Sequence, residues 1–141
     1  MAHDHEPDDD DYRRLLGLRT GLRQFLRWSE QQATAVGITP AQHQLLLTIR
    51  GLAGRDGPTI GDTADALLLH HHSAVGLVDR AVNAGLVDRH TDTIDHRVVR
   101  LRLTPLGTRR LRQLSAVHLE ELRRLAPRIR SLWANLEPAD S

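Results

Sequence analysis

The chain has 141 residues, enough for one domain with a buried core, and its formal net charge is only +1. It contains no cysteine, which excludes disulfides and thiolate metal sites, and only four aromatic residues, which argues against a module that stacks single-stranded bases. Its apolar runs are too short to span a bilayer and its N-terminus lacks the apolar segment of a signal peptide, so we expect a cytoplasmic protein without membrane contact.

The small net charge conceals an uneven distribution. Six of the 18 acidic residues lie in the first eleven positions, so residues 12–141 carry 19 basic residues against 12 acidic ones, a balance of +7. All the basic residues are arginine, and eleven of them lie between Arg89 and Arg130. The absence of lysine fits genomic codon bias, so the position of the charges is the stronger signal. A basic body of this kind favours a polyanionic partner.

Two helices are predicted in the first third of the chain. Residues 1–10 are acidic without periodicity and are expected to form a disordered tail. Residues 11–36 repeat apolar side chains every three or four positions, and Gly37 supplies a stop. Thr39-Pro40-Ala41-Gln42 combines an N-cap, a proline at the first helical position and a capping box, so a second helix is expected from there to a loop at residues 51–58.

Two short helices joined by a tight turn are predicted next. Residues 60–67 form the first, Leu68-Leu69-His70 the turn, and residues 71–84 the second, which Gly85 closes. In the second helix Val75, Val78 and Val82 are expected to point inward. The arrangement is that of a helix-turn-helix.

The hydrophobic period then changes to two, which is typical of strands. Strands are predicted over 86–90 and 98–103, with a polar hairpin tip at 91–97. In the second strand the odd-numbered residues from Val99 to Leu103 are expected to face inward, and Arg100 and Arg102 outward. A helix-turn-helix followed directly by a two-stranded hairpin indicates a winged helix.

The chain is expected to end in helix. Thr104-Pro105 provides a cap and a first helical position, and apolar residues keep a three/four spacing to Leu136. Pro127 lacks the N–H that a helix interior needs, so we predict a long helix to about Ala126 and a shorter one around 128–136.

The first and last helices carry apolar stripes that a small winged helix is too small to cover. We therefore predict a mainly α fold, an α+β winged helix-turn-helix over 39–104, with a helical dimerisation region at 11–36 and 105–136. A helical layer within a monomer is the alternative, but the homodimer is favoured.

Four segments together resemble one protein family. They are Ile38-Thr39-Pro40-Ala41-Gln42, Gly85-Leu86-Val87-Asp88-Arg89, Asp95-His96-Arg97 and Leu101-Arg102-Leu103-Thr104-Pro105-Leu106-Gly107, and in order and spacing they resemble the MarR family of bacterial transcriptional regulators. The resemblance spans roughly Leu15 to Leu136. Thr63, where the family usually has leucine, and the run His70-His71-His72 depart from the family pattern.

The resemblance implies that residues 71–84 are the recognition helix, which enters the major groove by its N-terminal end. The free N–H groups and positive dipole of a helix N-terminus suit a phosphate, the hydroxyl of Ser73 can donate to a base edge or phosphate, and Gly76 lets the backbone approach a base. Arg80 suits a phosphate or an ion pair with Asp79 or Asp88. The expected DNA contacts on this helix are His71, His72, Ser73, Gly76 and Arg80.

In the wing, the resemblance implies that Arg97 enters the minor groove and that Asp95 holds it in place. The chemistry is consistent, because a narrow minor groove attracts guanidinium and a carboxylate restrains the long side chain. An ordinary surface pair within the hairpin is the alternative. His96 is expected at the tip, and Arg100 and Arg102 either contact phosphates or are only solvated.

The three consecutive histidines allow two further hypotheses. Successive residues of a helix diverge by about 100°, so they cannot all bind one ion, and no metal site is predicted. Protonation near pH 6 would add positive charge and strengthen DNA binding.

The sequence holds no catalytic motif, so neither an enzyme nor a cofactor is expected. We predict a regulator, most simply a repressor, that binds a palindromic operator in double-stranded DNA as a homodimer and responds to a small-molecule effector, as the resemblance implies. Trp28 and His43 are weak candidates for lining the effector pocket. The alternatives are a winged-helix dimer that docks other proteins and a sequence-tolerant architectural DNA binder, which the salt dependence and the sequence specificity of binding would separate.

Overall fold

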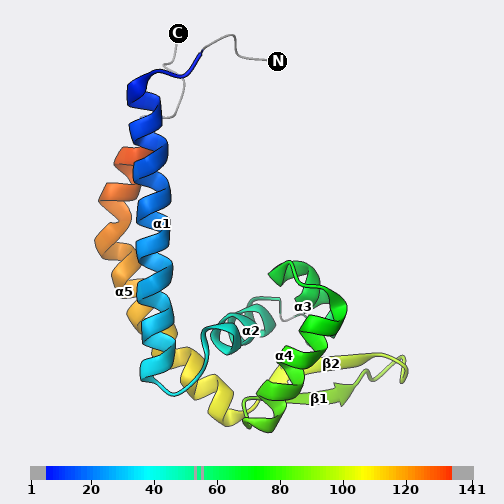
Figure 1. Ribbon diagram of the computed structural model, residues 1–141. Coiled ribbons are helices and arrows are strands. Elements are labelled where there is room, and N and C mark those ends of the chain that lie inside the picture. The colour runs from blue at the N-terminus through cyan, green and yellow to red at the C-terminus, as the bar shows by residue number, and fades with distance from the viewer. Residues whose placement is uncertain (1–5, 53, 55, 135–141) are drawn as a thin grey trace.

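The computed structural model describes residues 6–52, 54 and 56–134. The elements in chain order are α1 (Asp9–Ala35), α2 (Pro40–Gly51), α3 (Ile60–Leu67), α4 (His71–Asn83), β1 (Val87–Thr91), β2 (Val99–Leu103) and α5 (Pro105–Ala134). Figure 1 shows an L-shaped chain in which α1 and the later part of α5 run side by side, and the other elements gather at one end. We refer to α1 with the later part of α5 as the arm, and to α2–α4, the strands and the first turns of α5 as the body.

The arm begins earlier than the sequence suggested. The carboxylate of Asp8 accepts from the N–H of Asp11 at 2.8 Å, and the carboxylate of Asp11 accepts from the N–H of Asp8 at 3.0 Å, so the two form a capping box. Acidic side chains also stabilise the positive end of the helix dipole. Helix α1 therefore starts at Asp9, and the assignment of Asp9 and Asp10 to a disordered tail is wrong. Residues 1–5 of that tail lie outside the described residues.

The helices of the body start where their caps predict. Thr39 and Gln42 form the expected capping box of α2, and Thr59 with Asp62 forms a second one at α3. Leu68 ends α3 in the left-handed conformation at φ 56°, which lets the chain turn sharply into α4. The helix-turn-helix is thus confirmed.

The core lies in the body, where α2 and α4 meet the strands and the start of α5. The inward face of α4 differs from the predicted one: Val78 is buried as expected, but Val75 and Val82 are only partly buried. Ala74, Leu77 and Ala81 complete the buried face instead. The core residues of these elements are Leu45, Leu46, Ile49, Leu77, Val78, Ala81, Leu86, Val87, Leu101, Leu111 and Leu114.

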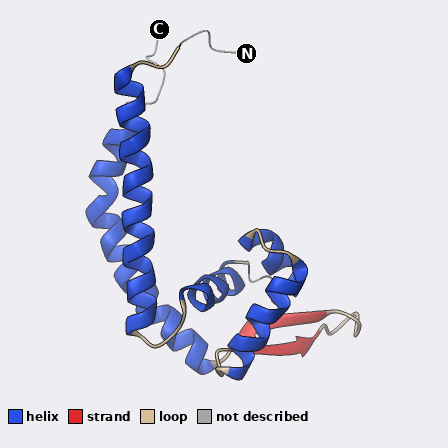
Figure 2. Cartoon of the chain, viewed as in Figure 1, coloured by secondary structure: helices blue, strands red, loops and turns tan. Residues whose placement is uncertain are grey.

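The two strands, red in Figure 2, form the wing. They pair antiparallel, with Val87 opposite Leu103 and Thr91 opposite Val99. The loop before α3 adds to this sheet, because the N–H of Leu101 donates to the carbonyl of Pro58 at 2.8 Å. The predicted winged helix is therefore confirmed. Val99, expected to face inward, is 41% exposed near the end of the hairpin.

Helix α5 bends as it leaves the body and then runs beside α1 (Figure 1). It continues across Pro127 without interruption, so the predicted division into two helices is wrong. Proline deprives the carbonyl four residues earlier, that of Arg123, of its N–H partner; both residues are exposed, so water can replace it. The predicted end at Leu136 lies outside the described residues.

The apolar stripes of the arm are mostly uncovered. On α1 only Ala33 is fully buried, whereas large apolar side chains along both arm helices remain exposed. The exposed residues of the arm are Tyr12, Leu15, Leu16, Leu22, Leu26, Leu119, Leu122 and Ile129.

Among the helices in the described part of the chain, none has the length and apolarity to cross a membrane.

Candidate DNA interface

The N-terminal turn of α4 is open to solvent. His71, His72 and Ser73 are exposed, and no side chain caps the first N–H groups of the helix. The core contacts of α4 are made by Ala74 and the residues one and two turns later, so the three side chains lie on or beside the outward face. This turn therefore offers free N–H groups and the positive helix end to an anionic partner.

Gly76 and Arg80 lie one above the other on the same outward face of α4. A Cβ placed on Gly76 would lie 3.3 Å from Nη1 of Arg80, so the guanidinium rests close to the glycine. Of the alternatives for Arg80, the ion pair with Asp79 is not formed, and the carboxylate of Asp79 accepts from Nη2 of Arg89 instead. Arg80 makes no ion pair with the residues that the structure describes, and its charge faces solvent.

The histidine run is arranged as a stack rather than as a ligand set. The rings of His70 and His72 are parallel within 4°, with centroids 5.8 Å apart. Within the described ranges, no group of three or more His, Asp or Glu side chains is placed to hold a metal ion.

At the wing, Asp95 and Arg97 form the pair that the sequence predicts. The carboxylate of Asp95 accepts from Nε of Arg97 at 3.0 Å, from Nη2 at 3.1 Å and from the backbone N–H of Arg97 at 3.1 Å. These bonds lower the pKa of Asp95, with the guanidinium as the main cause. The Arg97 side chain is nevertheless 91% exposed, so the carboxylate orients it without covering it.

Asp92 is a site residue that sequence reasoning missed. It is 6% exposed, and its carboxylate accepts from the N–H groups of Ile94 and Asp95 and from Nε of Arg100 at 2.7 Å. The N–H of Asp95, followed by the Arg100 guanidinium, lowers the pKa of Asp92 to about 2. Arg100 is therefore half-buried in an ion pair, so the expectation that it is only solvated is wrong, whereas a phosphate contact stays a prediction. An Asp that opens a turn, with an Arg on the pairing strand, is the signal that would have found this pair.

The tip of the wing presents two further side chains. His96 is exposed, as predicted. Ile94, which the sequence gave no reason to select, is 90% exposed on the turn that Asp92 fixes. The predicted site residues thus form two groups, one at the start of α4 and one at the wing tip.

The junction of body and arm holds a separate cluster of rings. His43 of α2 is buried, and its ring centroid lies 4.8 Å from that of His118 of α5. Nδ1 of His118 donates to the carbonyl of Leu114 at 2.7 Å, Nε2 lies 2.6 Å from the hydroxyl of Ser29, and Trp28 packs edge-on at 4.9 Å. Burial and the neighbouring His118 lower the pKa of His43.

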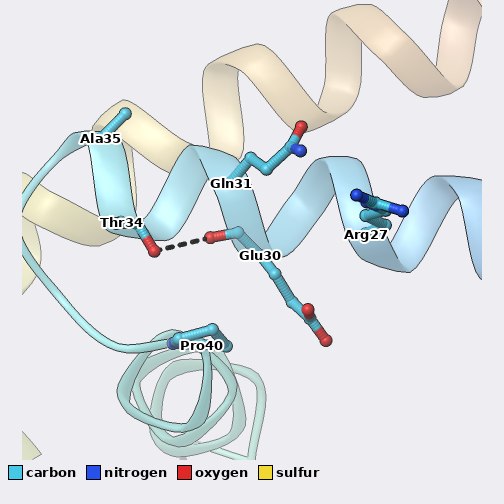
Figure 3. A pocket seen from close by; sticks show the side chains of 6 residues that line it. All are labelled: Arg27, Glu30, Gln31, Thr34, Ala35 and Pro40. Carbon is cyan, nitrogen blue, oxygen red and sulfur yellow. Dashed lines mark hydrogen bonds between the residues drawn. The ribbon is translucent and has the colours of Figure 1, made fainter.

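A shallow pocket of about 510 Å³ lies between the end of α1 and the start of α2 (Figure 3). Trp28 and His43 do not line it, so these two weak candidates belong to the ring cluster instead. The lining residues are Arg27, Glu30, Gln31, Thr34, Ala35 and Pro40.

Comparison with known proteins agrees with this architecture. Residues 36–97 match the model of the MarR family, and this region runs from α2 through α4 into the wing. A search among curated proteins gives no match.

Solved structures extend the similarity to most of the chain. A MarR family protein from Bacillus stearothermophilus is 24% identical, with a TM-score of 0.71, and the match covers 85% of this chain and 82% of that one. AbsC, a MarR family transcriptional regulator from Streptomyces coelicolor, is 19% identical, with a TM-score of 0.71 and coverage of 96% and 86%. MepR of S. aureus, in a complex with DNA, is 20% identical, with a TM-score of 0.68 and coverage of 93% and 95%. At these identities the structures show a common fold.

Proposed function

We propose, from the match of residues 36–97 to the model of the MarR family and from the geometry of the wing, that this chain is a DNA-binding transcriptional regulator that acts in the cytoplasm as a binding protein and not as an enzyme. The observation that carries the proposal is Arg97, which is 91% exposed at the wing tip and held by both oxygens of Asp95. A guanidinium presented in this way suits the negative potential of a narrow minor groove. The open N-terminal turn of α4, with His71, His72 and Ser73, would read the major groove.

The functional unit in this proposal is a homodimer. The exposed leucines of α1 and α5 are too numerous for a stable isolated arm, and a second copy would cover them with the same surface. A two-fold dimer carries two recognition helices, so its operator is a palindrome with half-sites about one helical turn apart. The simplest regulatory outcome is repression, by occupying that operator.

The effector of this regulator would be a small polar molecule, and the pocket of Figure 3 supports its placement. The pocket joins α1 of the arm to α2 of the body, so an occupant would contact both units. Arg27 and Glu30 offer opposite charges there, and they form no ion pair with each other. A ligand that changes the angle between arm and body would change the distance between the two recognition helices, and typical allosteric coupling of this kind amounts to about 1–3 kcal/mol.

The direct test is selection of bound sequences from random duplex DNA, followed by affinity measurements over a range of salt concentrations. We expect a palindromic consensus and an affinity that falls steeply as salt rises, because bound counterions are released from the phosphates. Equal affinity for random duplexes would indicate an architectural DNA binder. Affinity for no duplex, together with capture of a protein partner, would indicate a docking module.

Arg97→Ala tests the wing directly. Loss of a minor-groove contact should weaken operator binding by roughly tenfold or more. The matched control is Arg19→Ala, which removes the same charge from an exposed position on α1. Equal losses for the two variants would mean that only general electrostatic attraction is at work and would contradict the wing assignment.

A further inference from the structure

A continuous series of hydrogen bonds links the loop before α3 to the tip of the wing. The carbonyl of Gly57 accepts from Nη1 of Arg100 at 2.8 Å, and Nε of the same guanidinium donates to Asp92 at 2.7 Å. The other oxygen of Asp92 accepts from the N–H groups of Ile94 at 3.1 Å and Asp95 at 2.8 Å. Asp95 in turn holds the guanidinium of Arg97. Every step of this series is a direct contact.

We propose that Asp92 and Arg100 are positioning residues that fix the direction of the Arg97 guanidinium for DNA, an inference that rests on the proposed DNA-binding function. Arg97 is almost fully exposed, and Asp95 is its only hydrogen-bond partner among the described residues, so its direction is set by where Asp95 stands. Asp95 is itself placed by the bond from its N–H to the buried carboxylate of Asp92. Ordering a long side chain before binding saves the entropy that binding would otherwise cost.

The series of hydrogen bonds begins in the loop before α3. Gly57 has φ +86°, and a Cβ there would lie 2.3 Å from the carbonyl oxygen of Leu101. Only glycine therefore lets this loop approach β2 closely enough to offer its carbonyl to Arg100. Nearby, Nε2 of His90 donates to the carbonyl of Asp56 at 2.8 Å, which ties the same loop to β1.

The positioning role is distinct from support of the whole hairpin. The strands are held by their own backbone pairing from Val87–Leu103 to Thr91–Val99 and by the bond from Leu101 to Pro58. The carboxylate of Asp92 adds no backbone bond between the strands; it bonds the turn at Ile94 and Asp95 and the side chain of Arg100. Loss of its charge should therefore loosen the tip and leave the strands paired.

The existing contacts of Arg100 argue against a direct contact with a phosphate. It is half-buried, and both Nε and Nη1 already have acceptors. Arg102, two residues along the same strand, is exposed and makes no ion pair with described residues, so it provides the matched control.

The test is a double-mutant cycle on the full-length chain, with affinity measured for the duplex obtained by selection. Asp92→Asn should lower the affinity about five- to tenfold when Arg97 is present and less than about twofold when it is replaced by alanine, because the two residues act as a unit. Arg102→Gln should lower the affinity by the same factor in both backgrounds, as an independent charge does. Arg100→Gln should behave like Asp92→Asn.

Two further measurements separate positioning from folding. Circular dichroism and thermal unfolding establish that each variant is folded. If Asp92→Asn does not fold, the same double-mutant cycle with Arg100→Gln tests the inference. Hydroxyl-radical footprinting should show that protection of the minor groove beneath the wing is lost in the variant, while protection around α4 is kept.

Three results would overturn the inference, and they are distinguishable. Unchanged affinity of both Asp92→Asn and Arg100→Gln, while Arg97→Ala weakens binding, removes the positioning role and leaves the proposed function intact. Equal losses with and without Arg97 show that Asp92 does not act through it. A wild-type chain that binds no duplex specifically removes the proposed function and this inference together.

Discussion

The body and the arm of this chain differ in how completely they bury their apolar side chains. In the body, Leu46 and Leu101 are fully buried. In the arm, Leu16 is 63% exposed, and Leu22 and Leu26 are each 54% exposed. The body thus buries a core within one chain, whereas many large apolar side chains of the arm helices remain exposed although α1 and α5 contact each other. The proposed homodimer would therefore form through the arm, while the body keeps a core of its own.

Helix α5 belongs to both the body and the arm. Leu111 and Leu114, near its start, belong to the core of the body, whereas Leu119 and Leu122, about two turns later, are exposed in the arm. One continuous helix therefore belongs to both regions, so we expect a change in the packing of the arm to be transmitted to the body through α5. The predictions below test this division, from the largest expected effect to the smallest.

Leu46→Ala should destabilise the body strongly. Leu46 is fully buried in α2, and the substitution leaves a cavity in a core that has little freedom to collapse, at a cost of about 2–5 kcal/mol. The adjacent Leu47 on the same helix is 53% exposed, so Leu47→Ala is the matched control and should change stability by less than about 0.5 kcal/mol. Chemical denaturation measures both. Similar losses for the two variants would show that the body has no core of its own.

Leu22→Glu should break the proposed dimer and spare the body. A charge in the exposed stripe of α1 acts twice in a two-fold interface, so we expect the dissociation constant of the dimer to rise by roughly a hundredfold or more. Gln24→Glu introduces the same charge on the same helix, at a position outside the stripe, and should leave the dimer intact. Analytical ultracentrifugation over a concentration series distinguishes the two. A dimer that tolerates Leu22→Glu would mean that this stripe faces solvent.

Gly107→Ala should weaken the packing of the start of α5 against the rest of the body. A Cβ at Gly107 would lie 2.1 Å from the carbonyl oxygen of Leu86, a backbone atom that cannot move aside alone. We expect a loss of about 1–3 kcal/mol in thermal or chemical unfolding. The control is Gly51→Ala at the end of α2, where nothing lies within 4 Å of the added methyl group and the effect should be neutral or stabilising by up to about 1 kcal/mol. Equal unfolding midpoints for the two variants would contradict the tight packing at the start of α5.

The sequence predicts the parts of this fold that local chemistry specifies. The capping box of Thr39 and Gln42, the turn before α4 and the change of period at the wing depend on neighbouring residues, and each was found in its predicted place. The acidic start of α1 was misread, because a run of aspartates resembles a disordered tail unless the reciprocal bonds of Asp8 and Asp11 are considered.

The site residues divide in the same way. Asp95 and Arg97 are two positions apart, so their pair was predictable from the sequence. The Arg100 contacts were not: Asp92 is eight positions away, and Gly57 is 43 positions away and reaches Arg100 only because the loop before α3 folds against β2. The sequence alone does not place the carbonyl of Gly57 beside Arg100, so it predicts only that an arginine on this strand is solvated.

The smallest predicted effect concerns pH at the junction of body and arm. His43 is 7% exposed, packs against His118, and has a pKa below its ordinary value, because burial and the neighbouring His118 disfavour its charged form. Below the unfolded value of about 6.5, the unfolded chain therefore binds a proton that the folded chain does not. The contribution of His43 to the free energy of unfolding should therefore be fully present above that pH. It should fall as the pH drops towards the lowered pKa of the folded state.

His43→Phe keeps a ring in the cluster and removes the titration, so it should flatten the fall in unfolding free energy between about pH 7 and the lowered pKa. The same substitution at the exposed His72 leaves the junction untouched and should keep the wild-type slope. Denaturation at a series of pH values measures both slopes. His43 lies in α2 of the body and packs against His118 of α5. A slope that His43→Phe does not change would therefore mean that contact between the two regions does not disfavour the charged form of His43.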